Sequence, residues 1–92
     1  MIHESNKTRL VIRAKSLLSL QIGAAKNKVW SDYRTRLAHA CLLLSQERFE
    51  ESAQALRIAV KQADNSAVRN TVRLIYKVLK DTEYQNPGWK MP

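Results

Sequence analysis

The chain has 92 residues, with 45% apolar and 26% charged residues and only two glycines and two prolines. This length fits a single domain over residues 1–92, and the scarcity of helix-breaking residues favours an all-α fold. A domain of this size buries roughly 60–65% of its unfolded surface and has little material to line a deep pocket, so we expect no enzymatic activity.

The positive charge is concentrated in the two flanks of the chain. The formal net charge is +8, from 16 Lys and Arg against 8 Asp and Glu. Residues 5–31 contain six basic residues and no acid, 32–64 contain five of each sign, and 65–80 contain four basic residues and no acid. A positive field of this kind raises the association rate with nucleic acid or with an acidic protein surface.

Histidine and cysteine give no sign of a metal site or a redox site. Cys41 is the only cysteine, so no internal disulfide can form and we expect a cytoplasmic protein. His39 lies two residues away, roughly 200° around a helix, and His3 is the only other histidine. We therefore expect no metal and no cofactor. The chain has no apolar run of the roughly 18 residues that a membrane span needs, so we expect no membrane partner.

The first predicted helix follows an irregular start over residues 1–5. Arg9 and Arg13 fall on its polar face, and Gly23 ends or bends it. Such a basic start without acids is also typical of a transit peptide or of a helix at a membrane surface. The apolar side of the predicted helix contains Leu10, Ala14, Leu17, Leu18 and either Leu20 or Ile22.

The clearest pattern runs from residue 30 to residue 64. Two apolar stripes with three- and four-residue steps flank a polar break at 45–48, which predicts two antiparallel helices. Acids in the first turn of the second helix and Lys61 in its last turn suit the helix dipole. The stripes contain Trp30, Tyr33, Leu37, Ala40, Cys41 and Leu44, then Phe49, Ala53, Leu56, Val60 and Ala63. We expect a bundle of three to four helices around this hairpin.

This hairpin, over about residues 33–64, resembles a single tetratricopeptide-type helix pair, a unit of about 34 residues. The matching positions are Ala40, Leu43, Phe49, Leu56 and Ala59. The departures are Arg36 for the family's tryptophan, His39 for its leucine, Ser52 for its alanine and Asp64 for its closing proline. No second copy follows in the chain, and the resemblance implies that the partner is a protein.

The last predicted helix follows the capping cluster 64–66 and ends before an irregular tail over 86–92. It buries Val68, Val72, Ile75 and Leu79. Its outer face carries basic residues with no acid between them to pair with, and Tyr76 lies among them as a ring for stacking.

These features predict a non-enzymatic binding or adaptor module that docks onto an acidic protein partner. RNA or DNA binding by the same residues is the alternative, and a small phage or mobile-element inhibitor of a nucleic-acid-handling complex would have the same sequence features. A partly exposed apolar edge on so small a bundle also predicts a homodimer. The predicted binding residues are Arg9, Arg13, Arg69, Arg73, Tyr76, Lys77 and Lys80.

Overall fold

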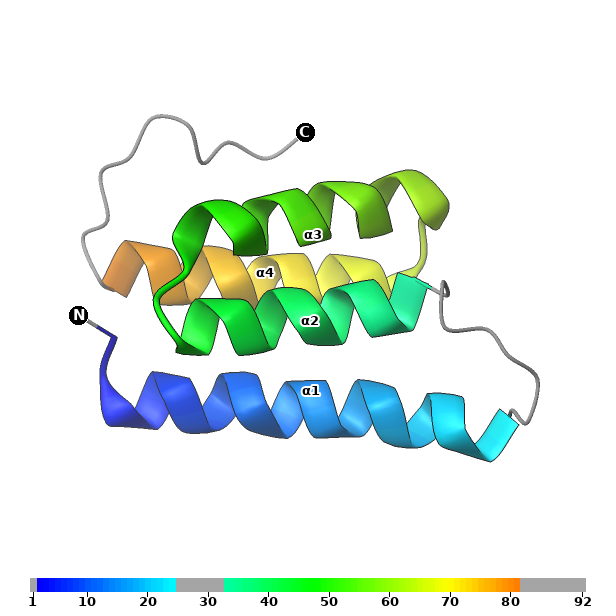
Figure 1. Ribbon diagram of the computed structural model, residues 1–92, viewed down its shortest axis with the longest axis horizontal. Helices are drawn as coiled ribbons and strands as arrows, with labels where there is room; N and C mark the ends of the chain where they lie inside the picture. Colours follow the sequence, from blue (N-terminus) through cyan, green and yellow to red (C-terminus); the bar gives the residue numbers. More distant parts are fainter. Residues whose placement is uncertain (1, 25–32, 82–92) are drawn as a thin grey trace.

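The computed structural model describes residues 2–24 and 33–81. These residues form α1 (Glu4–Ala24), α2 (Tyr33–Ser45), α3 (Phe49–Gln62) and α4 (Ser66–Asp81). Consecutive helices run in opposite directions along one shared long axis (Figure 1). The described residues contain no strand, and the predicted all-α bundle with a central hairpin is confirmed. The predictions for Trp30 and for the tail at 86–92 lie outside the described residues.

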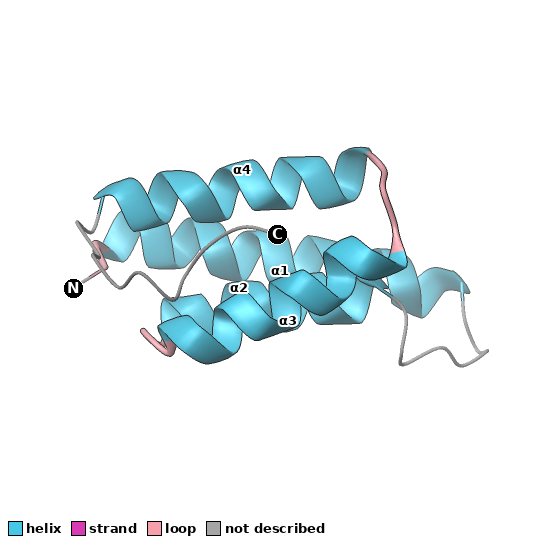
Figure 2. Ribbon diagram, turned by 90° about the horizontal axis from the view of Figure 1, so that it is seen from above, coloured by secondary structure: helices cyan, strands magenta, loops and turns pink. Residues whose placement is uncertain are grey.

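Helix α2 is the centre of the packing, because α1 and α3 both lie closely along it. Helix α4 touches each of the other helices more sparsely. Seen from above, α4 lies on one side of the bundle, opposite α3 (Figure 2). The side chains of α2 that become buried between its neighbours are Leu37, Ala38, Ala40, Cys41, Leu43 and Leu44.

Small side chains allow α2 and α3 to approach each other closely. Ala40 and Ser52 are both fully buried, and the Ser52 hydroxyl donates a hydrogen bond of 2.8 Å to the Ala40 carbonyl. The connection between the helices is short, with Glu47 in the left-handed region at φ 62°. This conformation is costly for a residue with a Cβ, so the tight turn is formed at some expense in backbone energy.

The start of the chain differs from the irregular segment that the sequence predicts over residues 1–5. Helix α1 begins at Glu4, and Ile2 is only 2% exposed. The backbone N–H of Ile2 donates to the Glu47 carboxylate over 3.3 Å, and the buried Asn6 amide donates to Asp81 over 3.3 Å. Burial of the Ile2 side chain, worth about 1.5–3 kcal/mol, offsets the entropy of ordering this end.

The predicted core positions are largely buried in the outer helices. Leu10, Ala14 and Leu17 of α1 are at most 1% exposed. In α4, Val68, Ile75 and Leu79 are buried, whereas Val72 keeps part of its surface exposed. The incomplete burial of Val72 follows from the sparse packing between α3 and α4, and it marks the place where the candidate site lies.

Candidate functional site: a basic row beside an apolar groove

The register of α4 places two different rows of side chains next to each other. Asn65 caps the helix, because its side-chain oxygen accepts the backbone N–H of Val68 over 3.0 Å. Side chains four residues apart form a ridge along a helix surface. The apolar row is Val68, Val72 and Tyr76, and the basic row, one position further along the chain, is Arg69, Arg73 and Lys77.

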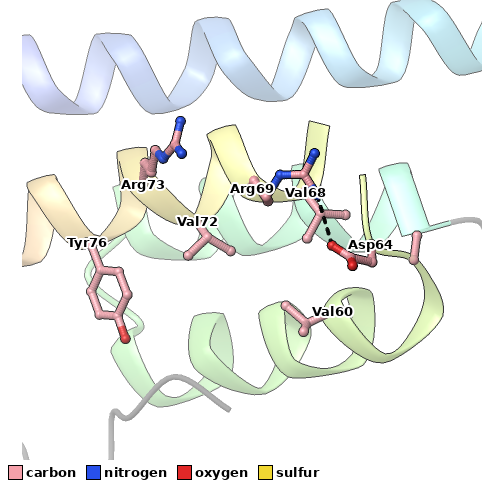
Figure 3. Close-up of a pocket in the computed structure, with 8 residues that line it drawn as sticks. Val60, Asp64, Val68, Arg69, Val72, Arg73 and Tyr76 are labelled. Carbon is pink, nitrogen blue, oxygen red and sulfur yellow. Dashed lines mark hydrogen bonds and ion pairs between the residues drawn. The ribbon is translucent and has the colours of Figure 1, made fainter. Parts of the chain in front are cut away.

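The apolar row borders a groove of about 580 Å³ between α3 and α4. Its opposite wall comes from Val60 in the last turn of α3 and from Ala63, the residue that follows the helix. Val60 points across the groove toward Val68 and Val72, and the Tyr76 ring points toward α3 (Figure 3). Val68 is 4% exposed at the base of the groove, while Tyr76 is 46% exposed.

Charged residues lie along the edge of this groove. Arg69 donates to the Asp64 carboxylate over 3.0 Å, and both side chains are largely exposed. An exposed ion pair of this kind contributes about 0–1 kcal/mol, so either member can exchange its partner readily. Arg73 also borders the groove, and its guanidinium extends from the groove edge toward the side of α4 that is turned away from α3 (Figure 3). The groove is therefore apolar on its inner surface and basic along one edge.

The positive surface extends from the groove along the outside of α4. Arg73, Lys77 and Lys80 are exposed, and within residues 2–24 and 33–81 no acid pairs with them. Arg9 of α1 is also exposed. Because the contacts of Asn6 with Asp81 and of Arg13 with Thr71 lie on either side of Arg9 along α1, Arg9 lies level with the second half of α4.

Arg13 has a different role from the other predicted binding residues. Its Nε donates to the Thr71 hydroxyl over 2.9 Å, and a terminal nitrogen donates to the Ala67 carbonyl over 3.1 Å. The guanidinium therefore joins α1 to α4 instead of standing on the outer surface. Thr71 is fully buried, and the apolar pattern of the sequence gives no sign of this polar position.

The position of Tyr76 also differs from the prediction. The sequence places it among the basic residues of the outer face, whereas its ring points into the groove (Figure 3). Six predicted binding residues remain exposed around the basic row and the groove: Arg9, Arg69, Arg73, Tyr76, Lys77 and Lys80. The groove itself, with Val60 of α3 and Ala63 just after it, is not predicted by the sequence, because it depends on how far α4 stands from α3.

The Cys41 thiol is free and buried. Burial raises the pKa of the Cys41 thiol from 9.0 to about 12, so the thiol stays protonated and unreactive at neutral pH. No three His, Cys, Asp or Glu side chains in the described part of the chain lie together in a way that would hold a metal ion. The candidate site is therefore the apolar groove with its basic edge.

Comparison of the chain with models of protein families, with curated proteins and with solved structures gives no match. The resemblance of α2 and α3 to a tetratricopeptide-type helix pair therefore stays a prediction. None of the four described helices combines the length and the hydropathy needed to cross a membrane.

Proposed function

We propose that this protein is a non-enzymatic binding module that docks onto an acidic protein partner through the basic row, Lys80 and Arg9. The observation that carries the proposal is the exposure of Arg73, Lys77 and Lys80 on successive turns of α4, where none of them forms an ion pair with a described acid. Asp81, which follows Lys80, accepts a hydrogen bond from the Asn6 amide instead. Like charges three or four residues apart weaken a helix by about 0.2–0.5 kcal/mol per pair. An acidic partner would remove this repulsion.

The groove favours a protein over a nucleic acid as the partner. A phosphate backbone would satisfy the basic row but would leave Val72 and Tyr76 half in contact with water. A protein can place apolar side chains against these two residues and carboxylates against Arg69 and Arg73 at the same time. This combination of an apolar centre and a charged rim is the usual composition of a protein interface. The resemblance of α2 and α3 to a protein-binding repeat points the same way.

Electrostatic attraction would act mainly on the rate of association. Charges at the rim of an interface steer the encounter and are screened by salt, whereas fully desolvated pairs slow dissociation. Lys77 and Lys80 lie away from the groove and should influence the association rate. Arg69 and Arg73, at the groove edge, should influence the dissociation rate as well.

The test is capture of partners from nuclease-treated extract, followed by direct binding of each purified protein. We expect the captured proteins to be acidic, and we expect the double variant Arg73→Glu/Lys77→Glu to lose them. The matched control is Lys15→Glu/Lys61→Glu, which makes the same change in net charge at exposed positions of α1 and α3. Capture that is equally weakened by both variants would contradict the proposed site.

Nucleic acid is tested in parallel with labelled RNA and DNA of mixed sequence. Binding through phosphates has a logarithmic affinity that falls linearly with the logarithm of the salt concentration, and each lost phosphate contact flattens the slope by roughly one unit. Affinity no tighter than the nonspecific range of about 10⁻⁴–10⁻⁶ M would agree with a protein partner. Tight binding that the Arg73→Glu/Lys77→Glu variant abolishes would replace our proposal by nucleic-acid binding.

A further inference from the structure

We infer that the groove between α3 and α4 receives an amphipathic acidic helix of the partner protein. The inference rests on the proposed function and specifies the partner segment that the same surface binds. It follows from the two parallel rows on α4, in which Val68, Val72 and Tyr76 lie beside Arg69 and Arg73. A helix with apolar side chains at positions i, i+4 and i+8, and with carboxylates on the adjoining ridge, presents the complementary pair of rows.

The geometry of helix packing makes a helix a better occupant than an extended segment. Ridges of side chains four residues apart pack into the grooves between the ridges of another helix. Val68 and Val72 are one such step apart, and Val60 faces them from α3 (Figure 3). The apolar side chains of the incoming helix would fill the space between these valines, which would bury the partly exposed Val72 and the half-exposed Tyr76 ring.

Charge selects this occupant over a second copy of the chain. A second copy would bring its own net charge of +8 toward the same basic row. Residues 82–92 are a further candidate, but they contain one acid and one lysine and so carry no net charge to match Arg69 and Arg73. An acidic partner helix is the only one of the three that matches both rows.

The ion pair at the edge of the groove gives the inference a specific signature. Asp64 already forms an ion pair with Arg69 at 3.0 Å, and it places a negative charge beside the groove. A carboxylate of the partner helix would take over Arg69, and it would have to displace Asp64 to do so. Asp64→Asn should therefore strengthen binding of an acidic helix by up to about fivefold, since an exposed pair is worth up to about one kcal/mol. A residue with a purely structural role would not produce tighter binding.

The probe is a synthetic helical peptide with leucines at i, i+4 and i+8 and glutamates on the adjoining ridge. Its binding to the full chain is measured by calorimetry, and the contact surface is mapped by amide chemical shifts. We expect the shifts to concentrate at Val60, Val68, Val72 and Tyr76. A peptide of the same composition with leucines distributed around the helix should bind at least about tenfold more weakly, because it cannot bury them in one groove.

Substitutions separate the groove from the basic row. We expect Val72→Gln to weaken peptide binding about tenfold, and the near-isosteric Val72→Thr to weaken it less. Val72 is partly exposed, so both variants should remain folded, which circular dichroism will check. The control variant is Lys15→Gln. Because Arg13 contacts α4, Lys15, two residues further along α1, points away from α4 and from the groove. It should leave binding unchanged.

Four outcomes would overturn the inference. The first is equal binding of both peptides, which would mean attraction by charge alone. The second is Val72-dependent self-association without peptide binding, which would assign the groove to a second copy. The third is a change in the amide chemical shift of Val72 when Trp89, a residue of the segment 82–92, is substituted in the free protein. This result would assign the groove to residues 82–92. The fourth is loss of partner capture in Arg73→Glu/Lys77→Glu but not in Val72→Gln, which would leave the proposed function intact and remove the groove from it.

Discussion

Arg13 of α1 and Thr71 of α4 are joined by a hydrogen bond of 2.9 Å across the two helices that bear the positive surface. The Thr71 hydroxyl accepts this bond and donates its own proton to the Ala67 carbonyl over 2.8 Å. A buried hydroxyl is costly unless it is hydrogen-bonded, so Arg13 completes a polar cluster that α4 would otherwise leave partly satisfied. The cluster fixes the position of α4, whose packing elsewhere is sparse.

The first prediction concerns this cluster. Arg13→Ala should lower the free energy of unfolding by about 1–3 kcal/mol, because it removes charge-assisted hydrogen bonds to Thr71 and Ala67. In a domain of this size, each kcal/mol corresponds to a shift of about 4–8 °C in Tm. Urea titration measures the change. Arg9→Ala, at an exposed position on the same helix, is the control and should stay within about 0.5 kcal/mol of the wild type.

The second prediction concerns the contact between α2 and α3. Ser52→Ala should cost about 0.5–1.5 kcal/mol, the net value of the lost hydrogen bond to the Ala40 carbonyl. Ser52→Leu should cost more, about 1–3 kcal/mol or beyond, because the fully buried site has no room for the larger side chain. The exposed Ser16→Ala provides the matched control. An unchanged urea midpoint for Ser52→Leu would contradict the inference that α2 and α3 approach each other too closely for a larger side chain.

A third prediction isolates the backbone cost of the α2–α3 turn. Glu47→Gly and Glu47→Ala both remove the carboxylate that accepts the Ile2 N–H, but only glycine adopts the left-handed conformation without a Cβ penalty. We expect the glycine variant to be more stable than the alanine variant by about 0.5–1 kcal/mol, after the greater flexibility of glycine in the unfolded chain is included. Thermal unfolding of the two proteins side by side measures the difference; equal stability would mean that the turn relaxes.

Sequence periodicity predicts those parts of the fold that are local to one helix. The hairpin break at 45–48 coincides with the observed turn, and Asn65 caps α4 within the predicted cluster. Burial of Leu10 and Ile75 follows from the same stripes. These features depend only on which residues share a face of a single helix, and the spacing along the chain determines that directly.

The candidate site depends on how separate helices are placed, which spacing does not reveal. Arg13 and Arg9 are one turn apart and look equivalent in the sequence, yet only Arg13 reaches Thr71. Tyr76 shares its turn with basic residues, and only the position of α3 reveals that the row it forms with Val68 and Val72 lines a groove. The basic row could be predicted because its residues belong to one helix, whereas the groove requires the position of α3 relative to α4.

The last prediction follows from the buried thiol of Cys41. Burial raises its pKa from 9.0 to about 12, so above pH 9 the unfolded chain loses this proton while the folded protein keeps it. The folded state then binds more protons than the unfolded state, and stability falls as pH rises from about 9 toward 12, by about 1.4 kcal/mol per unit for this group alone. Cys41→Ala removes this contribution. We therefore subtract the unfolding free energy of Cys41→Ala from that of the wild type. This difference should stay constant below pH 8 and decline between about pH 9 and pH 12. Urea titrations at stepped pH measure it, and a difference that does not change with pH would show that the thiol titrates normally and is accessible to water.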